Sequence, residues 1–356
     1  MNKKVNVIIP VCIAVSILYI FLAVRPLSKE IHFKTLWTTP CTRAATLPGD
    51  TVLHEEDYIP FKLGQTAGYF TEDGKIVNFF SFPYKATLSQ KEYALFGTSD
   101  SSIQIFSNKG EKTALIKKQG FPFFQDGRKY LMLPGGHSFA KLNDDGTVKF
   151  SFENYVPITA FSSSKSATAA GFADGTVIVF NNQGEIDYKY IPGGSTYDII
   201  LGTAVSDSGV LSACVSGHDK QRFVIAKKES GHSKIIFHQY LEEETNRQLL
   251  IKFSKDESKC FFEFKDHLGI VDCKTKKVSH IPVKGHILSI QETEDENTVF
   301  VLSKKDNTYS VHIIEKFDRY TGCFSFKADN AFITVKNNSL FVGRDSSISR
   351  IDISHK

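Results

Sequence analysis

Short stretches in which apolar and polar residues alternate make up most of this chain, and turn residues separate them. An alternation with a period of two is typical of half-buried strands, and Asn, Asp and Gly tolerate the positive φ angles of hairpin turns. The pattern predicts a four-stranded antiparallel sheet in residues 157–191. Its strands are expected at 158–161, 166–172, 176–180 and 186–191, and its turns at 162–165, 174–175 and 182–184.

The turn before the third strand of this unit recurs along the chain. An Asp heads a short β-branched or aromatic strand at six positions: Asp100, Asp174, Asp219, Asp266, Asp306 and Asp345. If Pro134-Gly135-Gly136-His137 fills the gap between the first two, the turns recur about every 41 residues, which lies within the range of propeller blades. The residues Asp-Ser-Ser-Ile at 100–103 also recur identically at 345–348.

Four short strands cannot bury both faces of a sheet alone, so such sheets are expected to stack around an axis. The sequence therefore predicts an all-β fold, a seven-bladed β-propeller. The blades are expected near residues 83–118, 121–152, 157–191, 198–240, 248–283 and 286–326, and from Ala331 to the C-terminus.

The seventh blade contains three strands, so its last strand, residues 347–352, needs a partner. We expect the ring to close by pairing of N- and C-terminal strands. In this arrangement residues 75–80 pair with the C-terminal strand, and residues 67–71 add an outer strand. An eighth blade built from residues 51–81 is the alternative.

An uncharged apolar segment, residues 5–24, comes after Lys3 and Lys4. Twenty helical residues span about 30 Å, the thickness of one bilayer core. We expect a transmembrane signal-anchor helix there, after a short basic N-terminus at residues 1–4. A cleaved signal peptide and lipidation of Cys12 are the alternatives.

Residues 25–50 contain three prolines and lack periodicity, so they predict a linker, and residues 51–356 predict the propeller domain. Positive charges on the two sides of the apolar segment nearly balance. A signal-anchor at the extreme N-terminus is nevertheless the ordinary route for exporting the domain on its C-terminal side. We expect a single-pass cell membrane protein whose propeller is extracytoplasmic, either periplasmic or extracellular.

The composition agrees with strands and argues against nucleic acid as a partner. The 356 residues include 30 Phe, 13 Tyr and 24 Gly but 2 Met and 1 Trp, a balance that favours strands and tight turns. The formal net charge is +4, with no block of five like charges. This charge is too weak for the basic stripe of a nucleic-acid-binding protein.

No combination of residues predicts a catalytic, cofactor-binding or metal-binding site. The recurring Asp side chains are expected to cap their own turns. The histidines lack metal-ligand spacing, and among them His137 alone comes after two glycines on a plausible exposed loop. The Gly-rich loops at 134–137 and 192–195 lack the Gly-Lys-Ser/Thr ending needed for phosphate binding, so they predict turns. The acidic run Glu242-Glu243-Glu244 is expected to be solvated; a partner or cation contact is the alternative.

Five cysteines lie outside the apolar segment, and none belongs to a Cys-x-x-Cys motif: Cys41, Cys214, Cys260, Cys273 and Cys323. Cys260 and Cys273 flank the Asp266-His267 turn symmetrically, so they are expected to face each other across one hairpin. Two reduced thiols are favoured there over a cross-strand disulfide.

Through its blade period and turn chemistry, the chain resembles the WD-repeat-like and quinoprotein-like β-propellers over roughly residues 50–356. It departs from the WD-repeat pattern because its single Trp, Trp37, precedes the expected ring, so the Trp-Asp dipeptide is missing. The calcium-binding and tryptophan-docking signatures of quinone-dependent dehydrogenases are missing too.

Membrane-anchored propellers of bacterial envelopes mostly act as scaffolds for other proteins. The resemblance therefore implies a membrane-tethered extracytoplasmic scaffold that binds proteins of the cell envelope, with no cofactor. A sensor or enzyme that binds a small ligand in the central channel is the alternative.

Overall fold

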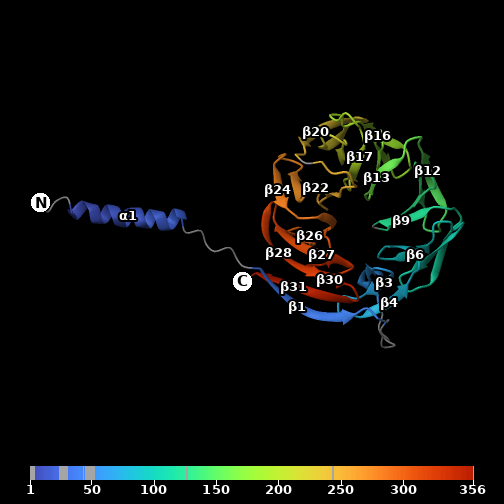
Figure 1. The fold of residues 1–356 in the computed structure, drawn as a ribbon, viewed down its shortest axis with the longest axis horizontal. Helices are drawn as coiled ribbons and strands as arrows, with labels where there is room; N and C mark the ends of the chain where they lie inside the picture. Colours follow the sequence, from blue (N-terminus) through green and yellow to red (C-terminus); the bar gives the residue numbers. More distant parts are fainter. Residues whose placement is uncertain are drawn as a thin grey trace. The chain divides into compact units, whose positions relative to one another are not determined.

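The computed structural model describes residues 5–23, 31–42, 44, 53–125, 127–242 and 244–355. The chain divides into two compact units, and the larger one, Thr35–Asp352, contains nearly all of the strands. Within this unit the sheets succeed one another around a ring (Figure 1).

The described residues form eight sheets, seven with four strands and one with three, so the ring is an eight-bladed propeller. The first sheet has the order β2-β3-β4, the eighth has the order β1-β31-β30-β29, and each of the others contains four consecutive strands. The strands of the first three sheets are β2 (Ile59–Leu63), β3 (Thr66–Phe70), β4 (Ile76–Ser81), β5 (Lys85–Leu88), β6 (Glu92–Phe96), β7 (Ile103–Ser107), β8 (Lys112–Ile116), β9 (Phe121–Gln125), β10 (Arg128–Met132), β11 (Ser138–Leu142) and β12 (Val148–Glu153).

The remaining strands complete the ring. The fourth to sixth sheets contain β13 (Ile158–Ser163), β14 (Ala167–Phe172), β15 (Val177–Asn181), β16 (Ile186–Tyr190), β17 (Ile200–Val205), β18 (Leu211–Ser216), β19 (Arg222–Glu229), β20 (His232–Tyr240), β21 (Ile251–Phe253), β22 (Lys259–Phe264), β23 (His267–Asp272) and β24 (Val278–Pro282). The last two contain β25 (His286–Glu292), β26 (Thr298–Lys305), β27 (Thr308–Glu315), β28 (Arg319–Lys327), β29 (Ala331–Lys336), β30 (Ser339–Arg344), β31 (Ser347–His355) and β1 (Ile31–Pro40).

The prediction of seven blades is wrong, and the alternative of eight is confirmed. All seven blades expected after residue 82 are present, because their turns carry the recurring Asp or its Pro-Gly-Gly-His substitute. The additional sheet is β2-β3-β4. Its first turn is Gly64-Gln65, which lacks the Asp signal that marks the other blades.

The ring closes between its N- and C-terminal strands, although one partner differs from the prediction. Residues 75–80 were expected beside the C-terminal strand, but β4 pairs with β3 in the first sheet. The partner of β31 is β1, which lies in the stretch 25–50 expected to be a linker. The Cys41 amide donates to the Ser346 carbonyl oxygen at 2.7 Å, and the hydroxyls of Thr38 and Ser349 lie 2.9 Å apart.

The aromatic side chain of Trp37 on β1 joins the eighth sheet to the first. Its ring centroid lies 5.9 Å from that of Phe341 on β30 and 6.4 Å from that of Phe70 on β3. Its Nε1 donates to the Glu72 carbonyl oxygen at 3.2 Å. Phe70 and Phe341 are fully buried, so the closing strand contributes to the core as well as to a backbone ladder.

Most of the core lies between neighbouring sheets. Phe223 on β19 stacks on Phe262 on β22, with centroids 3.9 Å apart and both side chains fully buried. Strands with large apolar residues on both faces can bury these residues only when each face of their sheet is covered by a neighbouring sheet. The ring is therefore a consequence of the sequence pattern itself.

A helix, α1 (Val5–Ala23), occupies most of the segment expected to be transmembrane, residues 5–24. Among the described residues, however, no helix is both long and apolar enough to cross a membrane. The prediction of a transmembrane helix in residues 5–24 is therefore wrong.

The ring has two faces, which carry different turns and connections. In the second to eighth sheets the first strand is innermost, and first strands of neighbouring sheets contact each other, as β13 contacts β17 and β25 contacts β29. Because successive strands are antiparallel, the turns after the second strand lie on the same face as the connections to the next sheet. We call this face the connection face and the opposite one the hairpin face.

Candidate functional site

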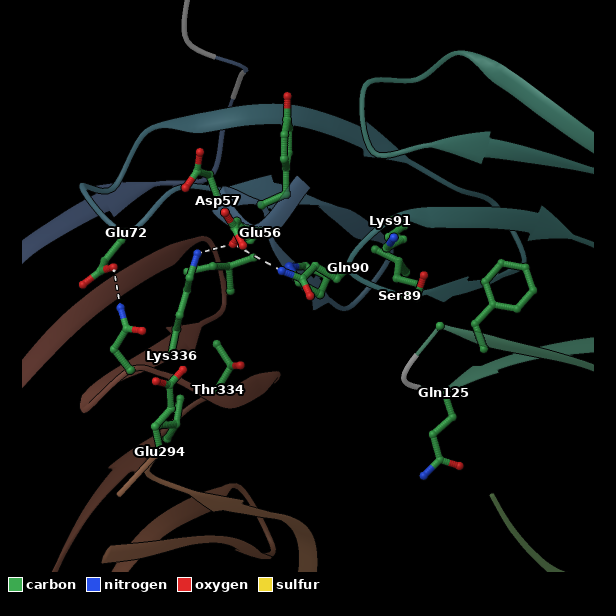
Figure 2. Close-up of a pocket in the computed structure, with 18 of the residues that line it drawn as sticks. Glu56, Asp57, Glu72, Ser89, Gln90, Lys91, Gln125, Glu294, Thr334 and Lys336 are labelled. Atoms are coloured by element: carbon green, nitrogen blue, oxygen red, sulfur yellow. Dashed lines mark hydrogen bonds between the residues drawn. The ribbon is translucent and has the colours of Figure 1, made fainter. Parts of the chain in front are cut away.

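A cavity with a volume of about 940 Å³ opens on the hairpin face (Figure 2). It is lined by the ends of the innermost strands β5, β9 and β29, by the turns after β21 and β25, and by η1 (Glu55–Asp57) with the start of β2. Its charged lining residues come from five sheets or from η1 and include Glu56, Asp57, Glu72, Lys91, Lys255, Glu294 and Lys336.

This cavity lies where the described part of the first sheet lacks an innermost strand. The start of β2 shares the cavity wall with the ends of β5 and β29, so β2 runs opposite to the innermost strands. It therefore corresponds to a second strand. In agreement, the Gln65 carbonyl oxygen accepts from the Phe82 amide at 3.0 Å, just as the Asp266 carbonyl oxygen accepts from the Val283 amide at 2.9 Å.

The short helix η1 connects the sheets on either side of this position. The carbonyl oxygen of Glu56 accepts from Gln90 Nε2 at 3.2 Å and from Lys336 Nζ, which lie in the second and eighth sheets (Figure 2). Lys91 pairs with Glu55 at 2.7 Å. These contacts fix the mouth of the cavity with groups from η1 and from the second and eighth sheets.

Among the other cavity charges, one is held by partners and two are exposed. Glu72 accepts from Asn337 Nδ2 at 3.1 Å and pairs with Arg350 at 3.1 Å. Lys255 and Glu294 are exposed on the turns after β21 and β25. The described residues contain no group of three or more His, Cys, Asp or Glu side chains that could hold a metal ion. The lining is chemically suited to a polar ligand of mixed charge.

A smaller cavity of about 380 Å³ lies between the innermost strands β9, β13, β17 and β25, and His286 is part of its wall. The carboxylate of Glu263 on β22 lies beside His286. One of its oxygens is 2.6 Å from Arg247 Nη2, 3.0 Å from His286 Nδ1 and 2.8 Å from the Ile287 amide. Burial raises the pKa of Glu263, but these hydrogen bonds outweigh it and lower the pKa overall. Glu263 therefore stays ionised and fixes the connections around the sixth sheet.

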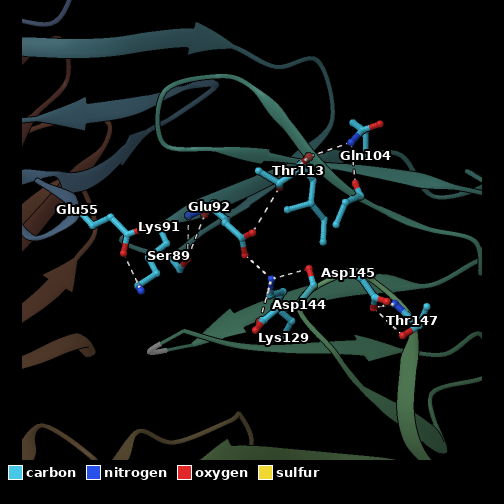
Figure 3. A network of polar contacts seen from close by, with 12 residues as sticks. Glu55, Ser89, Lys91, Glu92, Gln104, Thr113, Lys129, Asp144, Asp145 and Thr147 are labelled. Carbon is cyan, nitrogen blue, oxygen red and sulfur yellow. Dashed lines mark hydrogen bonds and ion pairs between the residues drawn. The ribbon is translucent and has the colours of Figure 1, made fainter.

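A second buried ion pair joins the second and third sheets (Figure 3). Lys129 Nζ lies 2.5 Å from Glu92, 3.5 Å from the Asp144 carboxylate and 3.2 Å from the Asp144 carbonyl oxygen. The Lys129 side chain is 5% exposed, so the pair is largely removed from water. Such a pair specifies how two blades pack, and sequence reasoning missed it because its members are far apart in the chain.

Of the recurring Asp residues, Asp100 and Asp174 accept from amides of their own turns as predicted, whereas Asp219, Asp266 and Asp345 accept from the connections between sheets. Asp219 accepts from Ser195 Oγ at 2.5 Å, and Asp345 accepts from the amides of Asp329 and Asn330 at 2.8 and 3.1 Å. The hydrogen bond from Ser195, with others from the same loop, holds the pKa of Asp219 well below its usual range. Asp100, Asp174 and Asp266 accept from nearby amides, and Asp266, Asp306 and Asp345 have positive φ.

One of the two Gly-rich loops forms the predicted turn, and the other is part of a longer connection. Pro134-Gly135-Gly136-His137 joins β10 to β11, so it fills the position where the other sheets carry Asp. Its Gly136 carbonyl oxygen accepts from the Ile158 amide at 2.8 Å, and its half-buried His137 accepts through the main chain from the Asn154 amide at 3.1 Å. Residues 192–195 form part of the connection from β16 to β17.

The acidic run 242–244 lies after β20 on the connection face. Glu242 and Glu244 are exposed, Glu244 accepts from the Lys220 amide at 3.1 Å, and Glu243 lies outside the described residues. The solvated position expected for Glu242 and Glu244 is confirmed.

The predicted facing of Cys260 and Cys273 is wrong. Phe264 pairs with His267, so the turn residues are Lys265 and Asp266, and Cys260 consequently lies opposite Val271. Both cysteines are free thiols in the described structure, and burial raises the pKa of Cys273 to about 11. The predicted register differs by two residues because Asp266 occupies the second turn position.

The connection face carries exposed aromatic residues that the sequence pattern did not single out. Tyr84, Tyr155 and Tyr197 lie on connections between sheets, and Tyr240 ends β20. Each is more than half exposed. Three of them lie within five residues of a Pro, which was the available sequence signal, since an aromatic residue in a Pro-containing turn has no strand face to cover it.

A family model described as a beta-propeller protein matches residues 1–356, and the chain belongs to that β-propeller family. An uncharacterized protein of Treponema pallidum (strain Nichols) is 30% identical over 346 residues, which cover 95% of this chain and 91% of that protein.

Two solved structures are similar in fold. BamB from Moraxella catarrhalis has a TM-score of 0.60 at 11% identity and covers 90% of this chain and 100% of its own. The C-terminal WD40 domain of Sif2 has a TM-score of 0.60 at 13% identity and covers 92% of this chain and 99% of its own. At these identities the likeness shows the fold alone, and it confirms the predicted β-propeller architecture.

Proposed function

We propose that this protein is a binding scaffold that presents one face of its propeller to other proteins. The observation that carries the proposal is the set of exposed tyrosines on the connection face. Large aromatic side chains contribute most of the binding energy in many protein interfaces, and they are costly to expose without a use. The cavity on the hairpin face instead has a charged lining, in which Glu72 and Lys336 are held by protein partners.

The proposal includes a place for the scaffold, the cell envelope, with the propeller outside the cytoplasm and membrane association through residues 5–24. It is supported by the sequence of this segment, which is uncharged, apolar and comes after two lysines. A protease added to spheroplasts should degrade the propeller without lysis. Protection of the propeller until the membrane is lysed would contradict this location.

Crosslinking in whole cells tests the binding function itself. Cells that produce the full chain with an affinity tag at the C-terminus are treated with a short amine-reactive crosslinker, and the tagged protein is purified under denaturing conditions. The expected result is at least one partner protein recovered reproducibly. The matched control is the same tag on an unrelated protein of the same compartment. Recovery of the same proteins with both would contradict the scaffold.

A second candidate function, binding of a small ligand in the channel, is favoured by the cavity of about 940 Å³. Lys255 and Glu294 are exposed at its edge, which suits a ligand carrying both charges. Native mass spectrometry of the purified full chain tests it. A bound small molecule that is lost in Lys255→Ala but kept in Lys274→Ala, an exposed lysine outside the cavity wall, would support ligand binding.

A further inference from the structure

Exposed apolar side chains gather on the connection face over the fourth and fifth sheets. Tyr155 is fully exposed on the connection before β13, and Tyr197 is 66% exposed on the connection before β17. Ile191 on the same connection is 58% exposed, and Tyr240 at the end of β20 is 52% exposed. Four large side chains in adjoining segments are more than the isolated exposed residues of an ordinary surface.

Hydrogen bonds and close contacts make these segments one continuous surface. The Ala173 amide donates to the Pro157 carbonyl oxygen at 3.0 Å, so the connection of Tyr155 touches the Asp174 turn. Gly175 of that turn packs against Asp198. The next turn joins in, because the His218 amide donates to the Tyr197 carbonyl oxygen at 3.1 Å. We call this surface, residues 153–157, 173–175, 191–198, 217–222, 240–242 and 244, the tyrosine surface.

Two tyrosines of the tyrosine surface, Tyr197 and Tyr240, are held in place by neighbouring groups. The Arg222 guanidinium lies over the Tyr240 ring at 5.7 Å and donates to the Pro192 carbonyl oxygen at 2.9 Å. The ring of Tyr197 meets that of His218 edge-on at 6.4 Å. Asp219 accepts from the Thr196 amide at 3.0 Å and so fixes the loop of Tyr197. Binding to such a surface loses little conformational entropy.

The charges around the tyrosines are mostly negative. Among the described residues of this surface the carboxylates outnumber the cations, which are Lys220 and Arg222, and Arg222 is already engaged with Tyr240. The whole chain has a formal net charge of +4, so the acidic surface runs against the overall balance. A partner with positive charge is favoured by this arrangement. The described carboxylates are Glu153, Asp174, Asp198, Asp219, Glu242 and Glu244.

We propose that the tyrosine surface binds a protein segment in which Lys or Arg residues accompany large apolar side chains. This inference rests on the proposed scaffold function and names its surface and the chemistry of its partner. The apolar side chains pack on Tyr155, Tyr197 and Tyr240, and the basic groups meet the carboxylates around them. Glu242 and Glu244 thereby gain the partner contact that was the alternative for this acidic run.

Fluorescence anisotropy with three labelled peptides tests the proposal on the purified full chain. The first peptide alternates Lys or Arg with Leu or Phe, the second replaces every basic residue with Glu, and the third replaces every apolar residue with Ser. The first is expected to bind at least about tenfold more tightly than the other two. Equal binding of the first and second peptides would overturn the proposal.

Variants place the binding on the surface. Tyr197→Ala and Tyr240→Ala should each weaken binding of the first peptide about tenfold or more, the effect of losing an interface anchor. Glu153→Lys combined with Glu242→Lys should weaken it and reduce its salt dependence. Tyr320→Ala, at the exposed start of β28, and Glu111→Lys are matched controls on the hairpin face and should leave binding unchanged. Circular dichroism verifies that each variant is folded. Equal losses in variants and controls would overturn the proposal.

A crosslinking comparison separates failure of this surface from failure of the scaffold function. A photoreactive amino acid is placed at position 197 or, as the control, at the exposed Gln183 on the hairpin face. Capture of a basic, apolar protein segment from position 197 supports the proposal. Capture from position 183 alone would overturn the tyrosine surface and leave the scaffold function intact. Capture from neither position would contradict both.

Discussion

At the scale of single residues, the buried ammonium of Lys141 on β11 makes the free energy of unfolding depend on pH. Its side chain is 8% exposed, and its Nζ donates to Asn182 Oδ1 at 2.7 Å. Burial, together with smaller repulsion from Lys149 and Arg128, lowers the pKa of Lys141 from 10.5 to about 8. The folded state therefore binds this proton less tightly than the unfolded state. The buried charge lowers the free energy of unfolding by its full amount below about pH 8.

Lys141→Met should raise the free energy of unfolding by about 1–3 kcal/mol at pH 7. The gain should shrink as pH rises from about 8 to 10.5, because the unfolded wild-type chain then also loses the proton. Urea unfolding at several pH values measures it. A gain that does not change with pH would show that Met stabilises through packing alone.

Lys129 is the matched comparison, since it is equally buried but faces the Glu92 carboxylate. Lys129→Met leaves that carboxylate without its cation, so it should lower the free energy of unfolding by about 3 kcal/mol. The same urea titration measures this loss. Opposite signs for the two lysine variants would confirm that the partner, and not burial itself, decides the effect.

A third prediction concerns Glu292 at the end of β25, which is 4% exposed. One of its carboxylate oxygens is buried without a hydrogen-bond partner in the described structure, and burial raises its pKa above 4.5. The ionised form is therefore destabilising at neutral pH, and protonation removes the cost as pH falls.

Glu292→Gln should raise the free energy of unfolding by about 1 kcal/mol at pH 7. The difference from wild type should vanish near pH 4, where the wild-type carboxyl is protonated in both states. Thermal unfolding at pH 7 and pH 4 measures it. Glu294→Gln, an exposed neighbour, is the control and should show little change at either pH.

Local chemistry explains which residue roles were readable from the sequence. An Asp that caps its own turn needs only neighbouring amides, so the roles of Asp100 and Asp174 are set at short range. Lys129 and Glu92 meet only after two sheets pack, and no local pattern marks them. The cavity wall is similar, because it brings together segments from several sheets.

At the scale of elements, the pairing of β1 with β31 joins the N-terminal and C-terminal parts of the chain within the eighth sheet and helps to close the ring. Removing residues 346–356 deletes β31, which leaves β1 without its ladder and exposes the apolar face beneath Phe341. The truncated chain should lose its cooperative thermal transition, as measured by circular dichroism. A chain that lacks residues 1–30 retains β1 and should keep the transition.

Turn chemistry also decides which sheets the sequence reveals. Seven sheets carry Asp, or the equivalent Pro-Gly-Gly-His turn, before their third strand, and their boundaries are predicted to within a few residues. In place of this turn signal the first sheet has Gly64-Gln65, with Gly64 at a φ of +59°. Without the signal, the sequence predicts that the strands of this sheet close the ring and do not form a separate blade. The strand β1 is missed because no periodic pattern marks its segment.

At the scale of the whole molecule, each sheet of a closed ring is covered on both faces by its neighbours. Unfolding of one blade therefore exposes an apolar face of the blade on either side of it. We therefore expect one cooperative unfolding transition for the propeller. Calorimetry should give equal calorimetric and van't Hoff enthalpies for that transition. A van't Hoff enthalpy well below the calorimetric value would show that groups of blades unfold independently, as in open repeat arrays.

The position of Trp37 gives the protein a built-in optical label. It is the single Trp of the chain, and it lies where the last sheet meets the first. Emission excited at the indole band therefore reports on this seam and on no other blade. A red shift of the emission that precedes the loss of far-ultraviolet signal would show the seam parting while the other blades remain folded.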